Sequence, residues 1–120
     1  MVAQKKLQEQ LTKNLLVPII LDLLNDHPMC GYEMMLIIRK TYGVNLGAST
    51  IYPILSNLDS LNLVSNDWEI ETCHPKKIYK LTQQGQNVLR ESLLSLSQIC
   101  KKLEGDQKKE KNVQIGMIFR

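Results

Sequence analysis

The stretch GASTIYPILSNLDSLNLV, residues Gly47 to Val64, decides the fold of this chain. Its apolar residues recur at the three- and four-residue spacing of one helical face, which predicts an amphipathic helix. These residues are Ile51, Ile54, Leu55, Leu58 and Leu61. We expect the helix to begin near Ala48. Pro53 then falls in the second turn, where it removes a backbone N–H and should bend the helix slightly.

Two further helices are predicted upstream. The apolar segment 14–26 follows a short amphipathic stretch, 4–14, and its Pro18 suits the first helical turn. We expect HPMCGY, residues 27–32, to form a turn. The segment 31–42 is the second helix, and Gly43 ends it as a C-cap glycine.

Downstream, the hydrophobic pattern changes to period two. Residues 63–71 and 76–81 alternate apolar and polar side chains across a turn at 72–75, which predicts a β-hairpin. A long final helix follows, capped by Thr82 and ending near Gly105. The predicted fold is mainly α (α+β): a winged helix-turn-helix with a two-stranded wing and a long C-terminal helix.

In that fold, the third helix enters the DNA major groove. Its polar face has no lysine or arginine, but hydroxyl and amide groups there can bond phosphates or base edges. The predicted DNA-binding residues of this helix are Ser49, Thr50, Tyr52, Pro53, Ser56 and Asn57. An ordinary solvated face is the alternative interpretation.

The wing supplies the positive charge. Lys76 and Lys77 follow its turn, and we expect them to bind phosphate. A solvated edge strand kept soluble by lysines is the alternative. Tyr32 opens the second helix and either reaches a phosphate or packs on the first helix. Trp68 and Tyr79 are expected to pack beneath the wing as core residues.

The final helix carries a heptad seam. Its apolar residues are spaced four, three, four and three apart, as in a coiled coil. The predicted dimerisation residues are Leu89, Leu93, Leu96, Cys100 and Leu103. Packing on its own domain is the alternative, but two heptads of isolated helix favour a partner, here a second copy.

Composition sets the remaining limits. The 120 residues are 43% hydrophobic, enough for one modest core, and the net charge of +3 permits an anionic partner. All 15 Lys and Arg lie outside residues 41–75, whereas that segment contains Asp59, Asp67, Glu69 and Glu71. The apolar run at 15–24 is too short to span a membrane, so we expect a cytoplasmic protein.

The three cysteines have no zinc-ligand spacing. Cys73 and His74 are adjacent, which is poor geometry for one tetrahedral ion, and His27 and Cys30 lie elsewhere in the sequence. No nucleophile signature, carboxylate pair or phosphate-binding loop is present. We therefore expect no metal, no cofactor and no enzymatic activity.

Three motifs resemble the PadR-like transcriptional regulators. They are Gly31–Tyr32–Glu33, then Thr50–Ile51–Tyr52–Pro53, then Ile78–Tyr79–Lys80–Leu81–Thr82 followed by Gly85. The single helix after the wing is similar to that of the smaller subgroup. The resemblance implies a homodimer, joined through the C-terminal helix, that represses transcription from a palindromic operator. Residues 83–103 contain no aromatic side chain, so a planar-drug pocket at the dimer axis is not expected.

The expected organisation has three parts. Residues 1–82 form a winged-helix DNA-binding domain with an N-terminal helical extension, 83–105 the dimerisation helix, and 106–120 a charged linker and apolar tail. The expected partners are double-stranded DNA and a second copy of the chain, while the effector, if one exists, is left open. The alternative functions are a protein-binding winged-helix module and a non-specific DNA-binding protein without an effector.

Overall fold

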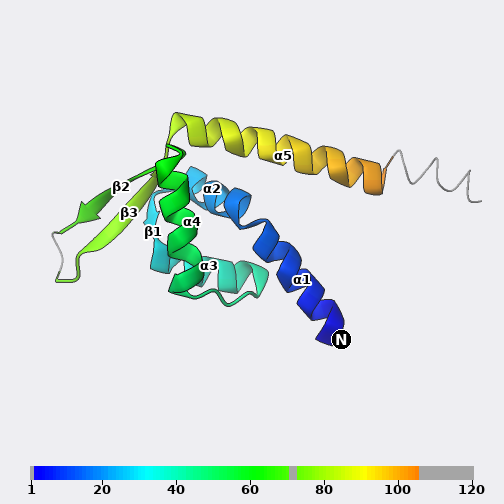
Figure 1. Cartoon of the computed structure of the whole chain (residues 1–120), viewed down its shortest axis with the longest axis horizontal. Coiled ribbons are helices and arrows are strands. Elements are labelled where there is room, and N and C mark those ends of the chain that lie inside the picture. The colour runs from blue at the N-terminus through cyan, green and yellow to red at the C-terminus, as the bar shows by residue number, and fades with distance from the viewer. Residues whose placement is uncertain (1, 71–72, 106–120) are drawn as a thin grey trace, which may run out of the picture. The chain divides into compact units, whose positions relative to one another are not determined.

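Five helices and a small antiparallel sheet make up the part of the fold that the structure describes (Figure 1). The computed structural model describes residues 2–70 and 73–105. The helices are α1 (Val2–Asn14), α2 (Leu16–Asp26), α3 (Gly31–Tyr42), α4 (Ala48–Ser60) and α5 (Gln83–Leu103). The strands are β1 (Met29–Cys30), β2 (Val64–Glu69) and β3 (Lys76–Leu81), in the order β1-β3-β2. The predicted winged helix-turn-helix is confirmed, with one more strand than expected.

That additional strand is β1. Met29 and Cys30 pair antiparallel with Tyr79 and Ile78 of β3, so the segment predicted as a turn, 27–32, contains a strand. Both β1 residues are buried. Two residues are too few to show an alternating pattern, and this is why the sequence did not reveal the strand.

α1 and α2 are separate helices that meet at Leu15. The break lies three residues before Pro18, whose ring clashes with the carbonyl of residue 14 in a continuous helix. Pro18 is then the third residue of α2, within the first turn as predicted. Leu7 and Leu11 of α1 are exposed.

α3 and α4 begin and end close to the predicted positions. Gly43 ends α3 with φ +70, and its N–H bonds the carbonyl of Arg39. α4 begins at Ala48 but ends at Ser60, earlier than the quoted stretch implied, because Asn62 adopts a left-handed φ of 60. Leu61 therefore lies beyond the helix and is 57% exposed, which corrects its predicted place on the apolar face.

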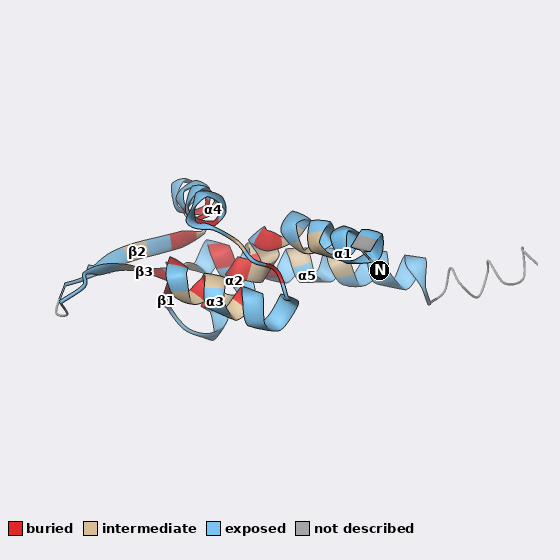
Figure 2. Cartoon of the chain, turned by 90° about the horizontal axis from the view of Figure 1, so that it is seen from below, coloured by how far each residue is buried: buried red, intermediate tan, exposed pale blue. Residues whose placement is uncertain are grey.

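The core is aliphatic and lies between α2, α3, α4 and the base of the sheet (Figure 2). The side chains of Ile20, Met34, Ile38, Ile51 and Leu55 have no exposed surface. The apolar face of α4 is therefore bound to the core, which leaves its polar face outward.

The wing is joined to α5 at a tight junction. Thr82 Oγ1 accepts a hydrogen bond from the Gly85 N–H at 2.9 Å, which confirms the predicted cap. The same hydroxyl contacts the carbonyls of Asn62 and Leu63 at 2.8 and 3.0 Å. These bonds tie the start of α5 to the segment that follows α4.

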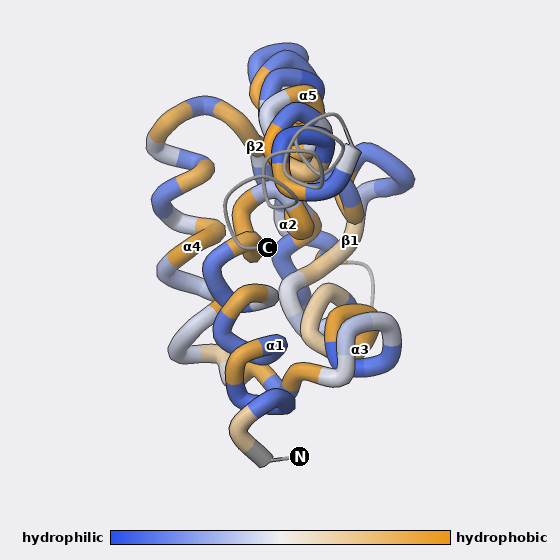
Figure 3. The backbone as a smooth tube through the Cα atoms, turned by 90° about the vertical axis from the view of Figure 1, so that its right-hand side faces the viewer, coloured by the Kyte–Doolittle hydropathy of each residue, from blue (hydrophilic) through white to orange (hydrophobic). Residues whose placement is uncertain are grey.

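The chain divides into two compact units, residues 1–89 and 90–120. The first turns of α5, as far as Leu89, belong to the first unit. In the second unit, the structure describes residues 90–105. Hydrophobic and hydrophilic residues are interspersed along this part of α5 (Figure 3). The expected borders after residues 82 and 105 stay predictions, and the predicted linker and apolar tail, 106–120, lie outside the described residues.

Candidate nucleic-acid interface

The exposed face of α4 carries all six residues predicted there. Ile51, Leu55 and Leu58 are at most 1% exposed, so the helix has only one face available to a partner. Tyr52 is 40% exposed. The exposed predicted residues of α4 are Ser49, Thr50, Tyr52, Pro53, Ser56 and Asn57.

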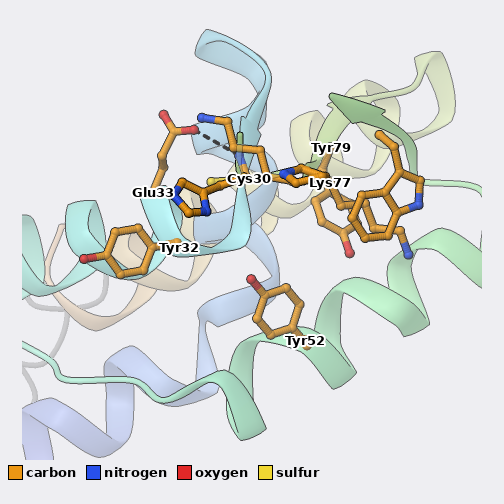
Figure 4. A pocket seen from close by; sticks show the side chains of 10 residues that line it. Cys30, Tyr32, Glu33, Tyr52, Lys77 and Tyr79 are labelled. Atoms are coloured by element: carbon orange, nitrogen blue, oxygen red, sulfur yellow. Dashed lines mark hydrogen bonds between the residues drawn. The ribbon is translucent and has the colours of Figure 1, made fainter. Parts of the chain in front are cut away.

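A groove of about 570 Å³ lies between the start of α3, α4 and the wing (Figure 4). It brings together four of the predicted DNA-binding residues, Tyr32, Tyr52, Lys76 and Lys77. The other five predicted residues do not line it. The remaining lining residues are Cys30, Glu33, Trp68, His74, Pro75 and Tyr79.

The start of α3 forms one wall of the groove, and Glu33 fixes it. The Glu33 carboxylate accepts a hydrogen bond from the Cys30 N–H at 3.3 Å, which closes a capping box (Figure 4). Burial alone raises the pKa of Glu33, but hydrogen bonds from Cys30 and the charges of Lys76 and His27 outweigh burial. The pKa of Glu33 therefore lies below its usual value of 4.5.

Tyr52 projects from α4 toward the start of α3 (Figure 4). Gly31, the first residue of α3, leaves the space that the Tyr52 ring fills, because a Cβ on Gly31 would lie 2.8 Å from Tyr52 Cε1. Tyr79 lies deeper and is 4% exposed, as predicted for a core residue. Burial raises the pKa of Tyr79 above 10, and Tyr52 and Asp59 add to that effect.

The wing contradicts one prediction. Trp68 is 61% exposed rather than buried beneath the sheet. Its face of β2 begins with buried Val64 at the base, but the hairpin extends past the helices, so residue 68 lies beyond the core (Figure 1). Alternation placed Trp68 on the correct face, and only the tertiary structure showed where the core ends.

The two wing lysines have different surroundings. Lys77 pairs with Trp68 across the strands, and its Nζ lies 5.8 Å from the centre of the indole ring. Lys76 lies opposite Glu69 in the register of β2 and β3. The sequence pattern predicted one role for both lysines. The strand register places them on opposite faces of the hairpin, although both line the groove.

The predicted dimerisation residues lie along α5. Leu93 is 48% exposed, Leu103 is 73% exposed and Cys100 is also exposed, whereas Leu96 is half-buried. Leu89 is 4% exposed and belongs to the core of residues 1–89, so its own chain already covers it. Packing within one chain therefore accounts for the first position of the heptad. Dimerisation through the other four stays a prediction.

Metal-ligating residues do not gather within residues 2–70 and 73–105. No three His, Cys, Asp or Glu side chains there are placed to hold one ion. Cys30, Cys73 and Cys100 are free thiols. Among the helices described, none has the length and apolar character that a membrane span requires.

Residues 20–91 match the model of the transcriptional regulator PadR-like family. The chain belongs to this family. Solved PadR-like structures also resemble it. The PadR-like transcription factor from Bacteroides fragilis is 26% identical, with a TM-score of 0.69, over 82% of this chain and 95% of that one. The PadR family regulator from Eggerthella lenta is 28% identical, with a TM-score of 0.74, over 85% and 88%.

A third PadR-like structure was solved with DNA. It is Bacillus subtilis PadR in complex with operator DNA, 29% identical, with a TM-score of 0.61, over 66% of this chain and 46% of that one. No curated protein matches the sequence. The PadR-like assignment therefore rests on the family model and on the solved structures, and it makes this chain a member of a transcription-regulator family.

Proposed function

We propose that this PadR-like protein is a cytoplasmic repressor that binds an inverted-repeat operator as a homodimer. The observation that carries the proposal is the shared groove. Tyr32 of α3, Tyr52 of α4 and Lys77 of the wing line one surface, and the polar face of α4 lies beside it. A Bacillus subtilis relative was crystallised with operator DNA, which supports DNA as the partner.

In this proposal α4 enters the major groove. Ser56 and Asn57 present a hydroxyl and an amide, which bond base edges or phosphates, while Ser49 and Thr50 lie at the helix N-terminus, which favours a phosphate. Because α4 carries no lysine or arginine, it contributes little electrostatic affinity. The wing lysines and the second subunit supply the rest.

The proposed dimer joins two copies through α5. Leu93, Leu96, Cys100 and Leu103 repeat at the heptad spacing, and a second copy would cover the exposed apolar side chains among them. Two α4 helices would then enter successive major grooves, with half-sites about 34–36 Å apart. The two-fold symmetry of such a dimer makes an inverted repeat the expected operator.

The competing candidate is a winged-helix module that binds a protein. It is favoured by the acidic centre of the chain, where Asp59 lies on α4 and Asp67 and Glu69 lie on β2. A module that binds only protein would not use the two wing lysines to bind DNA. DNA binding that depends on these lysines therefore distinguishes the two candidates.

The test is a mobility-shift titration with duplexes from the gene's own promoter and with duplexes selected from random sequence. We expect a shift with an inverted-repeat duplex and a fall of log K with log salt, with a slope of about −0.9 per neutralised phosphate. Lys76→Ala with Lys77→Ala should weaken binding. Lys101→Ala with Lys102→Ala removes the same charge from the end of α5, outside the groove, and should have a smaller effect.

Two outcomes would overturn the proposal. If no duplex shifts at low salt, the protein-binding candidate replaces it. If the selected duplexes contain a single half-site without symmetry, the homodimer on an inverted repeat is wrong, although DNA binding stands.

A further inference from the structure

Trp68 is the side chain that the proposed function leaves unused. It is the single tryptophan of the chain, and it is 61% exposed on β2. A large indole surface left open to water is unfavourable, and tryptophan in such a position is typical of a binding surface. Trp68 also lines the groove beside Tyr52.

The strand register shows which residues lie on the same face of the wing as Trp68. It lies on the face of β2 that also carries Val64 and Asn66, opposite Leu81, Tyr79 and Lys77 of β3. Val64 packs in the core, and the Asn66 amide donates to Asp59 of α4 at 3.1 Å. This inner face of the wing therefore turns toward α4, and Trp68 and Lys77 are its outermost pair.

Trp68 orders Lys77. The Lys77 ammonium lies 5.8 Å from the indole centre, within the range of a cation–π interaction, and the side chain is half-buried. The aromatic face restricts the lysine without neutralising its charge. Asp59 of α4 lies against the same face and accepts a hydrogen bond from the Asn66 amide. Because the indole is uncharged, it leaves the Lys77 ammonium available to an external anion.

Lys76 is differently placed. It alternates to the other face of the hairpin, opposite Glu69, although it also lines the groove beside Glu33. Its charge also lowers the pKa of Glu33. Glu33 and the cross-strand Glu69 therefore attract the Lys76 ammonium, and this attraction reduces what it can offer to a phosphate.

We propose that Trp68 and Lys77 form a backbone-binding pair of the wing, in which Lys77 binds a DNA phosphate and the indole packs on the adjacent deoxyribose. The inference rests on the proposed function and deepens it. A duplex against the exposed face of α4 meets the inner face of the wing, where this pair lies. Phosphate supplies the charge that complements Lys77, and the sugar supplies the apolar surface for Trp68.

The single tryptophan makes the contact directly observable. We expect the fluorescence of Trp68 to change during titration with a selected duplex, and to saturate at the concentration where the mobility shift saturates. Lys77→Gln and Trp68→Leu should each weaken binding about five- to tenfold, and the double variant by much less than the product, because the pair acts together. Lys80→Gln, at an exposed lysine of β3 that does not line the groove, is the matched control and should stay within about twofold.

The salt dependence gives an independent measure. Lys77→Gln should reduce the slope of log K against log salt by about 0.9, since one phosphate contact is lost, whereas Lys80→Gln should leave it unchanged. Circular dichroism should show all variants folded, because both side chains lie outside the core.

The proposal is overturned if a complex seen by mobility shift leaves Trp68 fluorescence unchanged, or if Lys80→Gln weakens binding as much as Lys77→Gln. Both results leave DNA binding intact, so they separate this inference from the proposed function. If the wild-type protein binds no duplex, both are wrong.

Discussion

The ring of Tyr52 occupies the space where Gly31 has no side chain. A Cβ on Gly31 would lie 2.8 Å from Tyr52 Cε1 and 2.9 Å from its hydroxyl oxygen, closer than nonbonded atoms approach. Gly31 begins α3 and Tyr52 projects from α4, so the contact joins the two helices of the helix-turn-helix. One glycine thereby sets the position of a side chain on the proposed DNA surface.

Gly31→Ala tests this relationship. Gly31 has no positive φ, so alanine brings no backbone strain, and its methyl group acts by displacing the Tyr52 ring. We expect DNA affinity to fall about fivefold, as for a loss of about 1 kcal/mol. In a Tyr52→Ala background the same substitution should have little effect. Equal losses in both backgrounds, measured by mobility shift, would show that Gly31 does not act through Tyr52.

Gly85→Ala tests the junction between the wing and α5. A Cβ on Gly85 would lie 2.1 Å from the Leu63 carbonyl oxygen, and backbone cannot move aside as easily as a side chain. We expect the free energy of unfolding to fall by about 2–3 kcal/mol, as for a severe overpacking substitution. Urea denaturation measures the change. Gln86→Ala, at an exposed neighbour on the same helix, should be within about 0.5 kcal/mol of wild type.

Glu33 makes stability depend on pH. Its pKa in the folded protein lies below 4.5, so the folded state favours the ionised carboxylate. The resulting stability is fully present above the unfolded pKa and is lost as the pH falls below 4.5 through the lower folded value. Glu33→Gln keeps an acceptor for the Cys30 N–H but does not titrate. A carboxylate titrates between about pH 3 and 6. Over that range, the urea midpoint should fall less steeply with decreasing pH in Glu33→Gln than in the wild type. Equal slopes would contradict the assignment.

Leu93 and Leu96 test the proposed dimer seam. Two glutamates there would place charge between the α5 helices of a dimer, at a cost far above the roughly 0.5 kcal/mol of an exposed substitution. We expect Leu93→Glu with Leu96→Glu to sediment as a monomer in analytical ultracentrifugation. Ser95→Glu with Gln98→Glu adds the same charge off the seam, at exposed positions, and should stay dimeric. A dimer that persists in the first variant would place the interface elsewhere.

Local sequence patterns determined the element order. The three- and four-residue spacing of Ile51, Leu55 and Leu58 predicted α4 and its buried face, and all three side chains are fully buried. Gly43 and Thr82 marked a helix end and a helix start because each acts on its nearest backbone groups. Such signals act over one or two turns, so the sequence by itself is enough to reveal them.

The tertiary structure decided everything that depends on distant neighbours. β1 exists only because β3 pairs with it, and Trp68 is exposed because the hairpin extends past the core. The alternation of apolar and polar residues predicted the wing, but it does not show at which residue of the hairpin the buried part ends. Tyr32, Tyr52 and Lys77 come from three separate segments, and only packing brings them to one groove. Periodicity determines on which face of a helix or strand a side chain lies. The residues that it contacts on that face come from segments far apart in the sequence, and only tertiary packing brings them together.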